Sequence, residues 1–287
     1  MKFLLTGCTG QLGWELERRL ATAGDLVACD RSTMDLSQSA NLAAIVRAHR
    51  PDVIVNAAGY TAVDRAQSEP DLALRINAEA VEVLALEARR AGALLVHFST
   101  DYVFDGTGVS PYGETDPTGP LGVYGQSKLA GEEAIRAAGA RHLILRTSWL
   151  YSSRRHNFLL TMLRLARERS ELRVVDDQTG APSWSRDVAA AVLAALTLPS
   201  PLEGLFHVSA AGQTTWCGFA RRILQIAGLA TPVRAIETVQ YPTPARRPHY
   251  SVLDSAAFSQ ATGFRIGSWD SRLAACMQEA GLSAARA

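Results

Sequence analysis

The chain has 287 residues, more than a typical domain of roughly 100 to 200, and a globular composition of 47% hydrophobic and 20% charged residues. Its net charge of +1 excludes the broad basic surface that nucleic acid or an acidic membrane requires, so we expect neither as a partner. The four cysteines have no paired spacing, residues 1–30 lack the pattern of a signal peptide, and no apolar run of about 20 residues occurs, so we expect a cytoplasmic protein without a membrane span.

Short apolar and β-branched runs predict strands at residues 2–6, 26–30, 52–56, 94–99 and 142–146. Between them, apolar residues at helical spacing, such as Leu12, Leu16 and Leu20, predict helices that each cover one face of a sheet. Strands that alternate with helices in this way form a parallel sheet. We therefore predict an α/β fold with a Rossmann-like, doubly wound parallel sheet.

The alternation of strands and helices loosens after about residue 150. An Ala-rich helix is expected at residues 187–196, and the C-terminal third, with its stretch YPTPARRPHYSVLD, is expected to form irregular structure over the carboxyl edge of the sheet. We therefore predict a Rossmann domain at residues 1–150 and a smaller C-terminal lobe at residues 151–287, with some segments of the lobe returning to the Rossmann domain.

A glycine-rich turn joins the first predicted strand to the first predicted helix. Glycines let the backbone turn tightly and approach a pyrophosphate, whose charge is favoured at a helix N-terminus. The spacing alone is weak evidence, and the flanking strand and helix strengthen it against the alternative of a structural turn. The turn therefore predicts a dinucleotide site whose contacts include Gly7, Thr9, Gly10, Gln11, Leu12 and Gly13.

The second predicted strand ends in Asp30 and Arg31. An acid at this place binds the ribose hydroxyls of NADH, whereas an arginine pairs with the 2′-phosphate of NADPH. Both cofactors therefore stay open. Asp35 and Leu36, in TMDLS, are expected near the adenine, although an acid near a helix N-terminus is an equally good interpretation of Asp35.

The segment VYGQSKLAGEEAI places Tyr124 and Lys128 four residues apart on one face of a predicted helix. A phenol titrates near pH 10 in water, so it is too weak an acid to protonate a forming alkoxide quickly at about pH 7, and a neighbouring ammonium lowers its pKa. We expect Tyr124 to donate a proton to a forming alkoxide. Lys128 is expected to lower the pKa of that phenol and to bind the nicotinamide ribose.

Seven segments carry a resemblance to a known family: TGCTGQLG, NAAGYTAVD, STDYVFDG, PLGVYGQSKLAGE, RTSWLY, DDQTGAPSW and RRPHYSVLD. Together they span nearly the whole chain, which resembles an extended short-chain dehydrogenase/reductase of the dTDP-4-dehydrorhamnose reductase group. The resemblance implies NAD(P)H-dependent reduction of the C4 ketone of dTDP-4-dehydro-β-L-rhamnose, with Thr100 as a third catalytic hydroxyl. Related 4,6-dehydratases carry Asp then Glu after that threonine. This chain has Asp101 then Tyr102, which favours a plain ketone reduction.

The resemblance also implies further contacts. Asn77 is similar to a helix residue that supports the active site, while Asp64 is as well interpreted as a solvated loop charge. A nucleotide sugar needs cations for its phosphates and flat surfaces for base and sugar, and the later part of the chain offers two tryptophans and two arginines for this. For the tryptophans, core packing is an equal alternative. The implied cofactor contacts are Ala57, Ala58, Gly59 and Tyr60, and the implied substrate contacts are Thr61, Val63, Thr100, Asp101, Phe104, Trp149, Asn157, Trp184, Arg246 and Arg247.

Two functional alternatives stay open: a reductase or epimerase of another nucleotide-linked 4-keto sugar, and a non-catalytic NADP-binding regulatory subunit. Some members of the family dimerise through Mg²⁺ bound by helix glutamates. Glu15 matches the first of these, whereas Arg186 and Asp187 occupy the region where another is expected, so Mg²⁺ is doubtful. The sequence leaves monomer and homodimer open.

Overall fold

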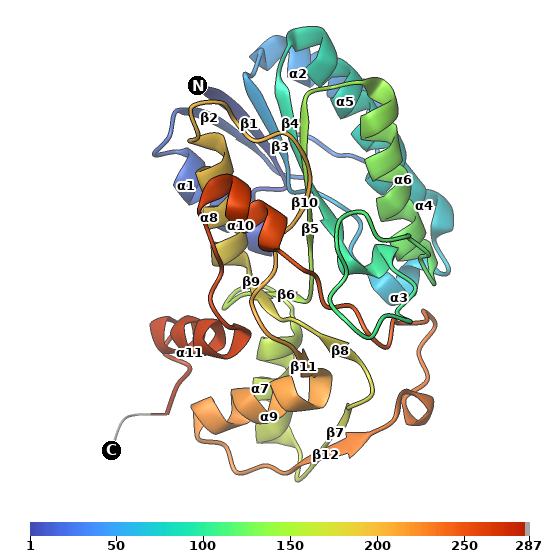
Figure 1. Cartoon of the computed structure of the whole chain (residues 1–287), viewed down its shortest axis with the longest axis vertical. Coiled ribbons are helices and arrows are strands. Elements are labelled where there is room, and N and C mark those ends of the chain that lie inside the picture. The colour runs from blue at the N-terminus through green and yellow to red at the C-terminus, as the bar shows by residue number, and fades with distance from the viewer. Residues whose placement is uncertain (285–287) are drawn as a thin grey trace.

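The computed structural model describes residues 1–284 (Figure 1). Its centre is a six-stranded sheet in the order β10-β5-β4-β3-β1-β2, in which every neighbouring pair is parallel. This confirms the predicted doubly wound sheet, and the five predicted strands begin and end within one residue of the observed ones. The strands are β1 (Lys2–Thr6), β2 (Asp25–Cys29), β3 (Val53–Asn56), β4 (Leu94–Thr100), β5 (His142–Thr147) and β10 (Gly204–His207).

Helices cover both faces of this sheet (Figure 1). The apolar side chains of β1, β3 and β4 alternate between two cores, since successive residues of a strand point to opposite faces. One core contains Leu5 and Val96, and the other contains Leu4 and Leu95. On the first face lie α1 (Gln11–Leu20), α8 (Ser185–Leu196) and α10 (Ala256–Thr262), and on the second lie α2 (Ser39–His49), α5 (Ala80–Ala91) and α6 (Val123–Ala138).

The segment between β3 and α5 is built from short helical pieces. The helices α3 (Val63–Ala66) and α4 (Pro70–Leu74) lead into a π-helical turn at Arg75–Glu79. Asn77, in that turn, is buried. Its amide accepts a hydrogen bond from the Tyr60 N–H at 2.8 Å and donates one to the Ser127 hydroxyl at 3.0 Å. Asn77 therefore ties the loop after β3 to α6, as expected of a supporting residue.

A second lobe lies at the carboxyl ends of the strands (Figure 1). Its core packs three helices, α7 (Phe158–Glu168), α9 (Trp216–Ala227) and α11 (Trp269–Glu279). Paired short strands complete it: β7 (Leu172–Val175) with β12 (Val233–Ile236), β6 (Leu150–Tyr151) with β9 (Ser183–Trp184), and β8 (Thr179–Gly180) with β11 (Thr214–Thr215).

The C-terminal third is more regular than its sequence suggests. The predicted helix at residues 187–196 is present as α8 and returns to the first lobe, as expected of some segments, but the strand β10, which pairs with β5, was not predicted. The short strand GLFH lacks the long apolar run of the earlier strands, which is why its pairing had no sequence signal. The tertiary contact with β5 decides it.

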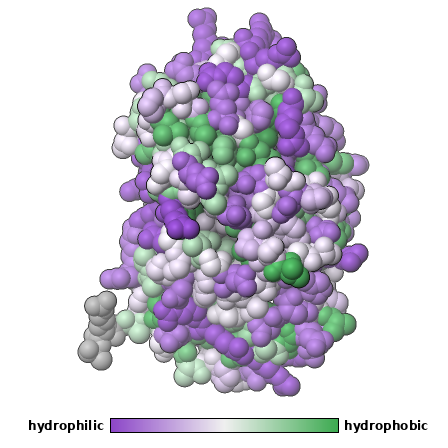
Figure 2. All heavy atoms as spheres, viewed as in Figure 1, coloured by the Kyte–Doolittle hydropathy of each residue, from purple (hydrophilic) through white to green (hydrophobic). Residues whose placement is uncertain are grey.

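The molecular surface is mixed. In the view of Figure 2, apolar side chains occur in small groups among polar ones. Within residues 1–284, no helix has the length and apolar character needed to cross a membrane.

Candidate active site

A cavity of about 820 Å³ lies between the carboxyl ends of the sheet and the second lobe. Loops after β1, β2, β3, β4 and β5 form its walls, as expected for an open parallel sheet. The structure brings most of the predicted site residues together here. Those that line the cavity are Gly7, Thr9, Gly10, Gln11, Leu12, Arg31, Asp35, Leu36, Ala57, Ala58, Gly59, Tyr60, Thr61, Val63, Thr100, Asp101, Tyr124, Lys128, Trp149 and Asn157.

The backbone of the glycine turn is shaped so that a ligand can approach it closely. Gly7 has φ +68°, and a Cβ there would lie 2.8 Å from the Ala58 backbone, so only glycine fits without strain. Gly13 does not line the cavity. A Cβ on it would lie 2.0 Å from the Gly7 carbonyl oxygen, so this glycine allows α1 to pack on the turn. The first two glycines of the turn line the cavity, and the third supports them.

The two charged residues after β2 differ in availability. The Asp30 carboxylate accepts hydrogen bonds from the Ser32 hydroxyl at 2.7 Å and the Thr33 N–H at 3.1 Å, which lower its pKa. It caps its own turn and does not line the cavity. Arg31 does line it, with its side chain 80% exposed and its Nε 3.5 Å from Asp35. At the edge of the cavity after β2, the structure therefore exposes the Arg31 guanidinium and not the Asp30 carboxylate.

Three candidate catalytic groups meet at the cavity floor. Thr100 ends β4, and Tyr124 and Lys128 lie one turn apart on α6. Burial raises the pKa of Tyr124 to about 12, against the opposing effect of a hydrogen bond with Thr100. The expected lowering of this pKa by Lys128 is therefore wrong for the structure as it stands. Burial dominates, and the lysine amine lies 3.1 Å from His97.

Asp101 is a buried carboxyl beside these groups. Its Oδ1 accepts a hydrogen bond from the Thr100 hydroxyl at 3.0 Å, and its Oδ2 has no partner within the described residues. Burial raises its pKa to about 7, although hydrogen bonds with Ser251 and Thr100 oppose the rise. Near neutral pH this side chain therefore exists partly as a neutral acid facing the cavity.

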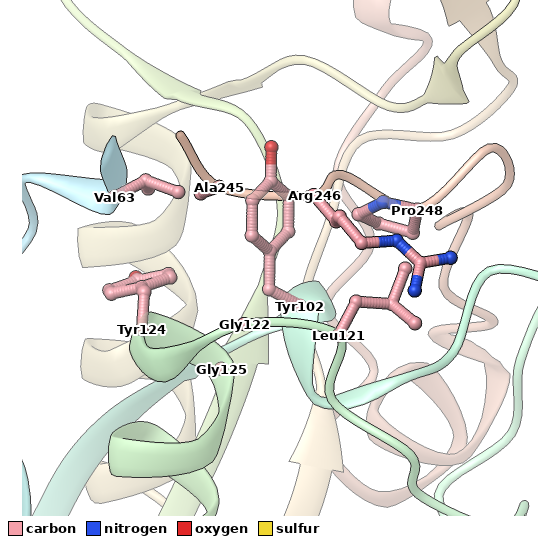
Figure 3. A pocket seen from close by; sticks show the side chains of 9 residues that line it. All are labelled: Val63, Tyr102, Leu121, Gly122, Tyr124, Gly125, Ala245, Arg246 and Pro248. Carbon is pink, nitrogen blue, oxygen red and sulfur yellow. The ribbon is translucent and has the colours of Figure 1, made fainter. Parts of the chain in front are cut away.

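A small pocket adjoins the cavity and is drawn in Figure 3. Tyr102 and Tyr124 lie in its wall with their rings edge to face, 5.9 Å apart. Arg246 lines this pocket and not the main cavity. Arg247 lines neither, because its guanidinium pairs with the Asp64 carboxylate at 2.8 Å. Asp64 is thus an ion-pair partner, which corrects its interpretation as a solvated charge.

The aromatic residues of the second lobe divide between cavity and core. Trp149, at φ +45°, lines the cavity and stacks on Trp216 with ring centroids 3.6 Å apart. Trp184 does not reach the cavity. It is 3% exposed and packs beneath the guanidinium of Arg186 at 4.6 Å, so the core interpretation holds for it. Phe104 is likewise buried outside the cavity, against Tyr112.

Asn157 lines the cavity, but its side chain is engaged in the fold. It caps α7 by accepting from the Leu160 N–H, and it donates to the Gln11 side chain at 2.9 Å and the Ser152 carbonyl at 2.8 Å. Because Gln11 belongs to α1 of the first lobe, this amide joins the two lobes beside the cavity.

Sequence reasoning missed a further set of lining residues. Those after β4 and β5 could have been found, because they follow predicted strands at the carboxyl edge. Residues contributed by α7 and α9 carry no local signal. The missed residues include Met34, Asn56, Ile76, Phe98, Thr147, Ser148, Leu150, Tyr151, His156, Phe158 and Trp216.

Comparison with known proteins now decides the family. The family model described as the RmlD substrate binding domain matches residues 1–282. The chain belongs to this family. It is 46% identical to a dTDP-4-dehydrorhamnose reductase of Burkholderia thailandensis (97% of this chain, 99% of the relative) and 47% identical to one of Escherichia coli K12 (94% of each). The family predicted from the sequence is confirmed.

Solved structures agree with this assignment. A dTDP-4-dehydrorhamnose reductase of Clostridium acetobutylicum superposes with a TM-score of 0.93 at 35% identity, covering 97% of this chain and 99% of the other. A Bacillus anthracis dTDP-4-dehydrorhamnose reductase in complex with NADP has the same TM-score and coverage at 34% identity.

The metal site found in some family members does not fit this chain. The Arg186 guanidinium lies 3.4 Å from Glu15 and also contacts Glu279. A side-chain cation therefore already pairs with Glu15, the one carboxylate that matches the metal site of those members. Within residues 1–284, no group of three or more metal-ligating side chains is present.

Proposed function

We propose that this protein uses NADPH or NADH to reduce the C4 ketone of dTDP-4-dehydro-β-L-rhamnose to dTDP-L-rhamnose. One observation carries the proposal: Thr100, Tyr124 and Lys128 meet in the same cavity as a glycine turn. This arrangement occurs in a chain 46% and 47% identical to two reductases of that name over nearly its full length.

The residues around the glycine turn fit the dinucleotide. Gly7 lets the turn pack against the Ala57–Ala58 backbone, and the turn lines the cavity at the N-terminus of α1, a place that suits a pyrophosphate. Ala57, Ala58 and Gly59 would leave room for the nicotinamide half, which supplies a hydride when bound. Arg31 would pair with a 2′-phosphate, so we propose a preference for NADPH.

The cavity residues then handle the ketone and its proton. The Tyr124 hydroxyl donates a proton to the ketone oxygen, and the Thr100 hydroxyl donates a hydrogen bond to the same oxygen as its charge develops. Lys128, as an ammonium, would donate a hydrogen bond to the nicotinamide ribose. Burial lowers the pKa of Lys128 to about 8, so the lysine is largely charged at neutral pH.

Two features separate this reaction from its alternatives. Tyr102 stands where the dehydratases carry a glutamate, so the site lacks the base for eliminating water. The complete set of Thr100, Tyr124 and Lys128 disfavours a regulatory subunit, which does not need them.

The stacked pair of Trp149 and Trp216 offers a flat surface for the nucleotide or sugar. We further propose a cytoplasmic enzyme, monomeric or homodimeric, consistent with four free cysteines.

The test is an assay of the purified protein with the keto sugar and each cofactor, followed through the nicotinamide absorbance band. We expect NADPH oxidation that depends on the sugar, and an NMR spectrum of dTDP-L-rhamnose. Tyr124→Phe is expected to lower kcat by about 10² to 10⁴-fold. Tyr112→Phe, which removes a phenol outside the cavity, is the matched control and is expected to keep kcat within about twofold. Absence of sugar-dependent oxidation would reject the function.

A further inference from the structure

The chain contains only two lysines, Lys2 and Lys128, and Lys128 is 6% exposed. Two side-chain contacts join β4 to α6 here, and one of them involves the Lys128 amine. His97 lies 3.1 Å from the Lys128 amine, and two residues further along β4 the Ser99 hydroxyl donates to Glu132 at 2.5 Å. Two residues of a strand and four of a helix advance by about the same length, roughly 6 to 7 Å, so the contacts lie side by side.

His97 is part of a buried chain of polar groups. Its other ring nitrogen, Nδ1, lies 3.1 Å from the side-chain amide nitrogen of Asn56. The Thr6 hydroxyl donates to the side-chain oxygen of Asn56 at 2.6 Å and accepts from the Ala58 N–H at 3.3 Å. Thr6, Asn56 and His97 are each at most 1% exposed. This series of hydrogen-bonded groups is shielded from water and extends from Lys128 to the Ala58 backbone beside the glycine turn.

The charge on Lys128 decides which group donates and which accepts in each of these hydrogen bonds. An ammonium has three donors and no acceptor, so it requires an unprotonated Nε2 on His97. The neutral ring then carries its proton on Nδ1. Because the structure places the Asn56 amide nitrogen against Nδ1 and the amide oxygen against the Thr6 hydroxyl, this direction requires the amide to be turned over, so that its oxygen accepts from Nδ1. The amide can present oxygen or nitrogen, and the Thr6 hydroxyl can donate or accept, so the chain permits this direction.

We propose that His97 is a positioning residue for Lys128: its Nε2 accepts a hydrogen bond from the ammonium and fixes it at the cavity floor. The catalytic consequence of this contact rests on the proposed function. The contact itself is present without cofactor or substrate. Nothing else in the reaction requires a histidine at this place, since its ring does not line the cavity.

The surrounding charges support this arrangement. The titratable groups that act on Lys128 are His97 from β4 and Glu132 from α6. The charge of Glu132 opposes the fall in the pKa of the lysine, and Glu132 also pairs with Arg146 of β5 at 2.7 Å. Burial and the charge on Lys128 hold the pKa of His97 well below its usual value, so the ring stays neutral. Without the Nε2 acceptor, the buried ammonium would lose a partner and its pKa would fall below about 8.

Because there are two lysines, the contact can be measured directly. Protein labelled with [¹³Cε]lysine yields one signal from Lys128 and one from Lys2, which serves as the internal reference. The variants His97→Gln and His97→Met have side chains of equal length, and only glutamine offers an acceptor at the position of Nε2. We expect glutamine to keep the pKa of Lys128 within about 0.3 of the wild-type value, and methionine to lower it by about one unit or more.

The pH profile of kcat supplies the catalytic readout. Activity falls as pH rises through the pKa of Lys128, so His97→Met is expected to move this alkaline limb to lower pH by about one unit, with KM changed less than threefold. His97→Gln is expected to retain the wild-type limb. This glutamine rescue is what a merely structural role of the ring would not produce.

Three results would overturn the proposal. They are an unchanged pKa of Lys128 in folded His97→Met, equal effects of methionine and glutamine, and a wild-type His97 whose ¹⁵N spectrum places the proton on Nε2. The last measurement needs no variant, so it decides the matter even if methionine prevents folding. Each concerns the free protein, and a keto sugar that is not reduced would instead reject the proposed function.

Discussion

Replacing Asp101 with asparagine should stabilise the protein in alkaline solution. The carboxyl is 2% exposed and burial raises its pKa from 3.8 to about 7. The native state therefore holds this proton more tightly than the unfolded chain, and the stability it confers is lost as pH rises from about 4 to about 7. At 1.36 kcal/mol per unit of pKa, the charged carboxylate costs the native state about 4 kcal/mol above pH 7. Asparagine has nearly the same shape and cannot ionise.

The measurement is urea unfolding of wild type and Asp101→Asn at pH 5 and at pH 8. Two units of that interval lie between pH 5 and 7, so the variant's advantage in free energy of unfolding should grow by about 3 kcal/mol. Asp105→Asn is the matched control, because hydrogen bonds with Thr107 lower the pKa of Asp105 and no such gain is expected. An advantage equal at both pH values would refute the reasoning. A stabilised variant with reduced kcat would mark Asp101 as a residue kept for function.

Three further outcomes follow from the site and its surroundings. Arg31→Ala should raise the KM for NADPH about tenfold and change that for NADH less than twofold, since only NADPH carries the 2′-phosphate; equal effects on both cofactors would contradict this assignment. Glu132→Gln should lower the free energy of unfolding by about 3 kcal/mol, because Arg146, whose side chain is 3% exposed, would lose the charge it pairs with. A loss below about 1 kcal/mol would show that the pair matters little. Excess EDTA should leave kcat and the oligomeric state unchanged, because Arg186 already supplies the cation that pairs with Glu15; dissociation or inactivation by the chelator would speak against it.

Much of the site was predictable because its signals are local. The strands follow from apolar runs buried on two faces, and the spacing of Tyr124 and Lys128 places them on one side of a helix whatever surrounds it. Gly7 needs a positive φ, which is a property of the residue itself. Such preferences act within a few residues, so a single sequence carries them in readable form.

The tertiary structure decided which charged and aromatic side chains are free to act. Arg247 pairs with Asp64 across 183 residues of chain, Trp184 turns into the core, and Lys128 finds His97 on a neighbouring strand. Partners that lie far apart in sequence meet only when helices pack on the sheet, and burial then sets their charges. The sequence alone therefore determined the fold and pointed to the candidate catalytic hydroxyls. Packing determined their electrostatic setting, because desolvation and ion pairing depend on neighbours that no local pattern encodes.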